Sequence, residues 1–271
     1  KMNYQRLRGV GRLLLWGSIL LLVLVIVPGN PIAITENNAT RWLGIRGTFL
    51  RFQPSELAKM AVVIYFSATI SKKREKMQTW SQGIWPYVLI LGVIALLMMR
   101  EPHLSGTILI VCTGIVLMIV GGIKGWLIPL GIGGVGLVGT LYVILVQKGI
   151  LGKGRQKFLY LPEEHNDCIF AVICEELGLV GACVIMLVFA LLILRGFWIA
   201  LHARDRFGAL LVVGFMTLTG LQTFLNIAVV TGLVPATGIS LPFFSYGGTA
   251  LLCQLAEMGI VLSVSRQMPA P

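Results

Sequence analysis

Long apolar runs separated by charged or Pro/Gly-rich turns most constrain the fold of this chain. The hydrophobic fraction is 56%, only 12% of the residues are charged, and the mean hydropathy is +0.88, which together exclude an ordinary soluble domain. The sequence therefore predicts an all-α fold, a polytopic transmembrane helical bundle that forms one domain over residues 1–271. The runs predict eight spans, at roughly 10–28, 55–71, 85–99, 104–121, 126–147, 178–195, 207–231 and 246–265.

The distribution of basic residues predicts the orientation of these spans. With a cytoplasmic N-terminus, the inside segments hold 13 Lys and Arg residues and the outside loops hold 8, so the positive-inside rule favours this orientation. An even number of spans returns the C-terminus to the same side. The net charge of +11 is dispersed among loops and forms no stripe with aromatic residues. We therefore expect anionic lipid head groups, and no nucleic acid, as partners of the basic residues.

An outer segment, residues 155–178, holds an unusual concentration of charge. Five of the 11 acidic residues of the protein lie in these 24 residues. Ionisable groups gathered in this way indicate chemistry on the outer face of the membrane. The charged candidates in the first half of the segment are Arg155, Lys157, Glu163, Glu164, His165 and Asp167.

The first outer loop, residues 28–53, is long enough to suggest a function. Arg41 lies in it beside aromatic residues, which fits either an interfacial belt or a rim that faces phosphate. A helix is predicted from Pro54, because proline suits the first helical position. Glu56 and Lys59 then lie on one face, able to pair. Ionisable side chains at this depth fit a cavity lining or a structural ion pair between helices.

Residues 232–248 form a second unusual stretch, with two prolines, four glycines and three aromatic residues between two apolar runs. Non-helical backbone at membrane depth persists only where it is buried in protein or lines a cavity. We therefore expect non-helical outer segments to form a cavity, with Ser245 as a candidate substrate contact. Glu257 in the last span needs a partner, for which Gln222 and Asn226 are candidates.

The five cysteines lie within or beside apolar runs, are odd in number and form no CxxC pair. They are interpreted as small buried apolar side chains, with no disulfide framework or zinc site.

Four motifs resemble a known family. QPSELAK at 53–59, RQKFLYLPEEHNDCIFAVICEELG at 155–178, QTFLNIAVVTGLVPATGISLPFFSYGG at 222–248 and RW at 41–42 are similar to the SEDS family (shape, elongation, division and sporulation), the FtsW/RodA/SpoVE peptidoglycan polymerases. The motifs occur in the family's order over essentially the whole chain. RQKFLYLPE and HND lean towards the division and sporulation branch, FtsW and SpoVE.

The resemblance implies a multi-pass glycosyltransferase of the bacterial cytoplasmic membrane that polymerises lipid II on the outer face with a class B penicillin-binding protein. The family's LPE-x-H-x-D pattern falls on residues 161–167, so the resemblance implies that Asp167 is the catalytic residue. Family members usually have ten spans. Eight spans here imply that two N-terminal spans, and part of the outer loop near 147–155, are lacking.

The implied reaction needs one general base, because forming a β-1,4 link from an α-linked sugar diphosphate inverts the anomeric centre and the diphosphate leaves without a proton. Asp167 fits the base. Its pKa is lowered if it caps a helix and raised if it is buried, and the sequence leaves both open. The departing diphosphate needs positive charge, which Arg41, Lys59, Arg155 and Lys157 offer.

A divalent cation, Mg²⁺ or Mn²⁺, is a further source of positive charge, and no organic cofactor is expected. No set of three protein ligands is evident, so the metal would be shared with substrate phosphates. His165 fits a metal ligand, a residue that orients Asp167, or a solvent-exposed side chain. Two alternatives to polymerisation remain at this point: a lipid II flippase or transporter, and a non-catalytic scaffold for a transpeptidase.

Overall fold

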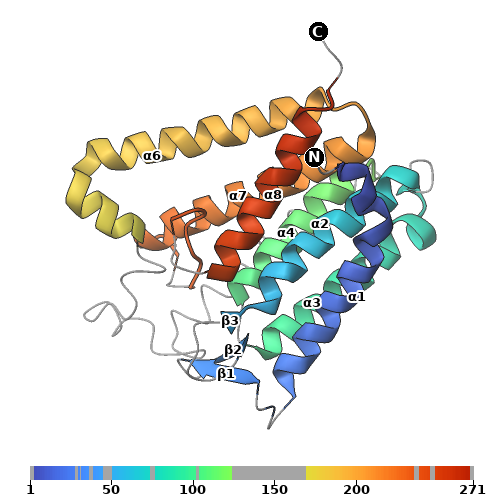
Figure 1. Cartoon of the computed structure of the whole chain (residues 1–271), viewed down its shortest axis with the longest axis horizontal. Coiled ribbons are helices and arrows are strands. Elements are labelled where there is room, and N and C mark those ends of the chain that lie inside the picture. Colours follow the sequence, from blue (N-terminus) through green and yellow to red (C-terminus); the bar gives the residue numbers. More distant parts are fainter. Residues whose placement is uncertain are drawn as a thin grey trace.

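The structure, a computed structural model, describes residues 3–27, 30, 32–36, 39–44, 51–73, 77–101, 104–123, 169–234, 238–244 and 248–268. Over these residues the chain forms a bundle of α-helices with a small sheet at one end (Figure 1). The α-helices are α1 (Leu7–Ile26), α2 (Pro54–Lys72), α3 (Trp85–Arg100), α4 (Leu104–Val120), α6 (Ile169–Leu201), α7 (Arg206–Val230) and α8 (Gly248–Ser265). A 3₁₀ turn, η1 (Tyr4–Arg6), precedes α1, and a π-helical turn, η3 (Trp80–Ile84), precedes α3.

Helices α2 and α7 form the centre of the bundle. Helix α2 packs against α1, α4, α7 and α8, and most of its side chains are buried. A close approach of α2 and α7 requires glycine: a Cβ atom at Gly214 would lie 2.5 Å from a methyl carbon of Val63. Small residues at such crossings let helices pack tightly where lipid supplies no hydrophobic drive between them.

A three-stranded antiparallel sheet caps the end of the bundle where α2 and α8 begin, called here the sheet end. Its strands, in spatial order, are β1 (Ala33–Glu36), β2 (Ala39–Gly44) and β3 (Arg51–Phe52). Leu43 pairs with Ala33 on one side and Phe52 on the other. The sheet contacts α1, α2 and α8. Sequence reasoning predicted a long loop here and missed the strands.

Helix α6 lies at the edge of the bundle and packs mainly on α7 (Figure 1). Its backbone is interrupted at Gly178, where φ is 64° and ψ is −166°, a conformation that glycine adopts at little cost. The observed helix is therefore longer than the predicted span over 178–195. It begins at Ile169, before the kink, and ends at Leu201, six residues after Arg195.

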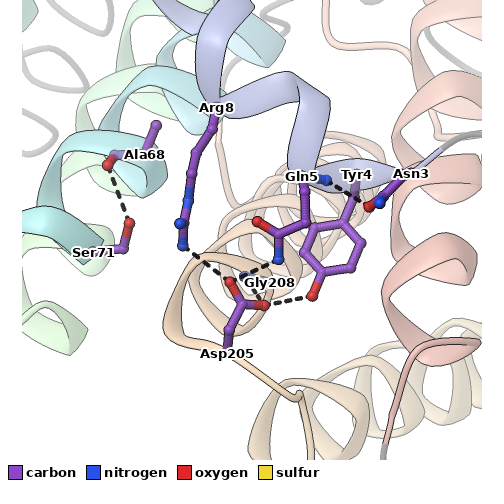
Figure 2. Close-up of polar contacts among 8 residues, drawn as sticks. All are labelled: Asn3, Tyr4, Gln5, Arg8, Ala68, Ser71, Asp205 and Gly208. Carbon is purple, nitrogen blue, oxygen red and sulfur yellow. Dashed lines mark hydrogen bonds and ion pairs between the residues drawn. The ribbon is translucent and has the colours of Figure 1, made fainter.

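A polar cluster ties the N-terminus to the turn between α6 and α7, at the end opposite the sheet (Figure 2). Asp205 accepts hydrogen bonds from the hydroxyl of Tyr4, from Gln5 Nε2 at 3.1 Å and from Arg8 Nη2 at 3.0 Å. It also caps α7 by accepting from the backbone N–H of Gly208. The cluster joins residues about 200 positions apart, and sequence reasoning missed it.

The predicted polytopic helical bundle is confirmed. Helices occur at seven of the eight predicted spans, and the eighth, 126–147, lies outside the described residues. Four described helical segments are long and apolar enough to cross a membrane by themselves: Tyr4–Ile26, Ile169–Leu201, Arg206–Val230 and Gly248–Ser265. The prediction that the cysteines are buried is wrong for Cys183, which is exposed on α6, and Cys112, Cys174 and Cys253 are only partly buried; Cys168 lies outside the described residues.

Candidate functional site

A buried ion pair lies in the first two turns of α2. Lys59 Nζ is 2.8 Å from Glu56 Oε2, and the two side chains are 6% and 8% exposed. Pro54 starts the helix, and the i, i+3 spacing puts both groups on one face. The predicted pairing of Glu56 with Lys59 is confirmed.

Glu257 of α8 adds a second carboxyl to this pair. Its side chain is buried, and it interacts electrostatically with Lys59 and with Glu56. We call Glu56, Lys59 and Glu257 the ionic cluster. One buried ammonium therefore compensates the charge of two buried carboxyls, so both carboxyls depend on Lys59.

The amide nitrogens of Gln222 and Asn226, the expected partners of Glu257, hold a non-helical loop. Gln222 Nε2 donates to the carbonyl of Ser240 at 3.0 Å, and Asn226 Nδ2 donates to the carbonyl of Ile239 at 2.7 Å. The non-helical loop 238–244 leaves backbone carbonyls that no helix satisfies, and these two amides of α7 satisfy them. The expectation that Gln222 and Asn226 serve Glu257 stays a prediction, because these hydrogen bonds account only for their amide nitrogens.

Gln254 of α8 holds the same loop from the other side. Its Oε1 accepts a hydrogen bond of 2.8 Å from the backbone N–H of Phe243. Phe243 has φ of 66°, a left-handed conformation that costs a non-glycine residue about 1–2 kcal/mol. Gln254 lies one helical turn before Glu257, so α8 joins the loop to the ionic cluster. Sequence reasoning missed Gln254, although a glutamine within an apolar run is a visible signal.

Gln254→Met keeps the length of the side chain and replaces its carbonyl oxygen by a poor acceptor. We expect the folded protein to lose about 1–3 kcal/mol, because the N–H of Phe243 is left without its partner. Hydrogen exchange of peptides that cover 238–244 should become faster. Gln267→Met, beyond the far end of α8, is the matched control. Unchanged exchange in the Gln254 variant would show that this bond does not hold the loop.

Arg41 and Glu101 meet at the sheet end. Arg41 Nε of β2 donates to the backbone carbonyl of Glu101 at 3.3 Å, in the turn that follows α3. The Glu101 side chain is 3% exposed, and its Oε1 has no hydrogen-bond partner among the described residues. Burial raises the pKa of Glu101 to about 8, and the positive charge of Arg41 opposes this rise.

The raised pKa of Glu101 predicts a pH-dependent stability. Above the ordinary pKa of 4.5 the unfolded chain loses the proton that the folded protein keeps up to about pH 8, so wild-type stability falls over this window as pH rises. Glu101→Gln removes this loss. We expect its melting temperature in detergent to rise relative to wild type between about pH 5 and about pH 8. The exposed Glu176→Gln is the control, and parallel curves for Glu101→Gln and wild type would refute the prediction.

Of the predicted site residues, the structure describes Arg41, Glu56 and Lys59. It brings the last two together with Glu257, and it places Arg41 against Glu101. Helices α2 and α8 both contact the sheet, so Arg41, Glu56 and Glu101 lie near the sheet end, and Glu257 lies deeper in the bundle. The other predicted site residues lie outside the described residues: Arg155, Lys157, His165, Asp167 and Ser245.

Comparison with known proteins shows the family. The family model for FtsW, RodA and SpoVE, described as "Cell cycle protein", matches residues 1–150 and 148–269. The chain belongs to this family. The predicted SEDS membership is thereby confirmed, and the chain is a multi-pass membrane protein.

Relatives named for the division and sporulation branch match over nearly the whole chain. A probable peptidoglycan glycosyltransferase FtsW of Geobacter sp. (strain M18) is 36% identical, covering 93% of this chain and 77% of the relative. Stage V sporulation protein E of Bacillus subtilis (strain 168) is 35% identical, covering 97% of this chain and 81% of the relative. The lean towards the FtsW/SpoVE branch agrees with these matches.

Two solved structures share the fold of this chain. The rod shape determining protein RodA of Thermus thermophilus superposes with a TM-score of 0.79 at 28% identity, covering 100% of this chain and 82% of that one. A chain from a structure titled as a peptidoglycan synthase complex that coordinates polymerization and crosslinking gives a TM-score of 0.83 at 28% identity, covering 100% and 84%.

Proposed function

We propose that this chain is a peptidoglycan glycosyltransferase that polymerises lipid II on the outer face of the bacterial cytoplasmic membrane. The observation that carries the proposal is the match to relatives named peptidoglycan glycosyltransferase at 33–36% identity over 93–99% of the chain. The charged residues near the sheet end, Arg41, Glu56, Lys59 and Glu101, support the proposal. A transfer reaction between charged lipid-linked sugars needs a polar site, which purely apolar transmembrane helices do not provide.

Asp167 is the proposed general base. It occupies the last position of the LPE-x-H-x-D pattern, two residues before α6 begins at Ile169. In the proposed step the carboxylate of Asp167 takes the proton of the acceptor 4-hydroxyl as that oxygen forms its bond to the anomeric carbon of the donor. The bond to the diphosphate breaks on the opposite face of the sugar, and the diphosphate leaves as an anion. One carboxylate is enough, in contrast to glycoside hydrolysis, where the departing oxygen needs a proton.

Arg41, Arg155 and Lys157 are proposed to stabilise the negative charge of the diphosphate. Lys59 has a different setting, because its ammonium group is already bonded to Glu56 and buried. We propose that Lys59 and Glu56 act as a fixed part of the wall that faces the substrate. Ser245 and His165 stay proposed substrate contacts.

A divalent cation, Mg²⁺ or Mn²⁺, would supply further positive charge at the diphosphate if substrate phosphates provide most of its ligands. Within the residues that the structure describes, no group of three His, Cys, Asp or Glu side chains is placed to hold a metal ion.

A class B penicillin-binding protein is the proposed partner. The structural neighbour with the TM-score of 0.83 comes from a peptidoglycan synthase complex that couples polymerization to crosslinking. A glycan strand made at the outer face needs crosslinking by a transpeptidase on the same side, which favours a partner of this kind.

A transporter is the second candidate, favoured by the depth of Glu257. This buried carboxyl is the tenth of the 18 residues of α8, about 14 Å along the helix from its start. Proteoliposomes with labelled lipid II distinguish the two functions. The proposal expects glycan strands from lipid II supplied to the face where the sheet end lies. Movement of lipid II between leaflets without any glycan product would favour the transporter.

A further inference from the structure

Three side chains form a stack near the end of α6, on the side of the bundle opposite the sheet. The guanidinium carbon of Arg195 lies 4.1 Å from the ring centroid of Trp198. The rings of Trp198 and His202 are stacked with centroids 4.3 Å apart and an interplanar angle of 27°. We call Arg195, Trp198 and His202 the α6 stack.

The α6 stack holds the guanidinium of Arg195 against the ring of Trp198 and leaves its N–H groups available to a ligand. Arg195 is exposed, and among the described residues no carboxylate or carbonyl is bonded to it. His202 is fixed in turn by a ring nitrogen 2.9 Å from the carbonyl of Trp198. A planar guanidinium whose face is covered by an aromatic ring presents its N–H edge outward, which is the geometry that binds phosphate through two donors.

An exposed apolar stripe leads to the α6 stack along the same face of the helix. Val184, Val188 and Leu191 precede Arg195 at intervals of three or four residues, Leu187 lies beside Val188, and the four apolar side chains are 54–59% exposed. The opposite face of α6, where Gly196 and Ala200 are buried, is the one that packs on α7, and a Cβ atom at Gly196 would meet Met216 of α7. The stripe therefore faces away from the bundle, at the edge occupied by α6 (Figure 1).

The combination of an apolar stripe with a terminal guanidinium matches a phospholipid. The stripe covers about 10 Å of helix from Val184 to Leu191, enough for a large part of an acyl chain. Two further exposed basic residues follow α6: Arg204 lies in the turn between α6 and α7, and Arg206 is the first residue of α7. The local positive charge therefore favours an anionic head group over a zwitterionic one. Tryptophan is typical of the level of the head groups.

We infer that the α6 stack and the apolar stripe form a binding site for one anionic phospholipid, with the phosphate held by Arg195 and an acyl chain along Val184–Leu191. The site is separate from the ionic cluster and does not depend on the proposed enzymatic activity. Its orientation places it in the leaflet that the positive-inside rule predicts to be cytoplasmic.

Retention of lipid by the purified full chain tests the site. Native mass spectrometry would count phosphatidylglycerol and phosphatidylcholine bound after equal exposure in mixed micelles. We expect preferential retention of phosphatidylglycerol, reduced about tenfold by Arg195→Gln because one charge-assisted bidentate contact is lost. Arg195→Lys should lose most of the preference as well, since an ammonium cannot reproduce the planar fork. Trp198→Leu keeps the charge and removes the support, and should give an intermediate loss.

Arg266→Gln is the matched control, because Arg266 is exposed near the same end of the bundle and belongs to no stack. Its effect should stay within about twofold, the size expected of a screened surface charge. Equal losses in the Arg195 and Arg266 variants would overturn the site in favour of general attraction. Equal retention of the two lipids would overturn it too. Displacement of phosphatidylglycerol by millimolar inorganic phosphate would show that the group recognised is free phosphate and would overturn the lipid assignment.

Discussion

Asp167→Asn is expected to abolish glycan formation while the protein stays folded and bound to its partner. The amide has nearly the shape of the carboxylate but cannot take the proton of the acceptor hydroxyl. General base catalysis contributes typically 10²- to 10⁴-fold to a rate, so a loss of at least about a hundredfold is predicted. The rate of lipid II consumption by the purified protein, measured with the penicillin-binding protein present, gives the comparison.

Glu164→Gln is the matched control for this loss. Glu164 is a carboxylate of the same acidic segment, three residues before Asp167, and carries no role in the proposed step. We expect its rate to stay within about threefold of wild type, because the segment's charge changes by the same amount without removing the base. If both variants lose activity equally, the segment acts through its overall charge and the assignment of Asp167 is wrong.

Lys59→Met is expected to cause the largest loss of stability. The substitution keeps most of the apolar stem and removes the only ammonium that faces Glu56 and Glu257 in the described structure. Breaking a buried pair by removing one partner costs about 3–5 kcal/mol, because a buried charge is left uncompensated. A large fall in the thermal unfolding midpoint in detergent should follow.

Two further variants separate lost charge compensation from lost packing. Glu257→Gln leaves the 2.8 Å bond between Lys59 and Glu56 intact and removes the second carboxyl, so we expect a much smaller change. Adding Glu56→Gln to Lys59→Met should recover much of the stability, since replacing both members of a buried pair is often nearly neutral. If the double variant is as unstable as the single one, packing of the lysine stem and not charge explains the effect.

Local spacing predicted local contacts well in this chain. The pairing of Glu56 with Lys59 follows from the i, i+3 rule, and the start of α2 at Pro54 follows from the preference of proline for the first helical turn. The ion pair and the helix start both depend on a single helix, so the local sequence contains the information that determines them.

Contacts between distant elements were not predicted. Glu257 joins Lys59 only because α8 packs beside α2, and Asp205 meets Tyr4 only because the turn after α6 returns to the N-terminus. The strands of the sheet are two to six residues long, too short for an alternating pattern to reveal them. The catalytic role of Asp167 was predicted from the family resemblance alone, because no local spacing distinguishes a catalytic aspartate from a helix cap.

The most direct test of the central claim is the product that this chain forms from lipid II. The wild-type chain would be reconstituted with a class B penicillin-binding protein, labelled lipid II and Mg²⁺, and both glycan strands and released undecaprenyl diphosphate would be quantified. We expect glycan strands of many disaccharides, with one undecaprenyl diphosphate released for each link formed. Intact lipid II after prolonged incubation, with the complex assembled, would contradict it.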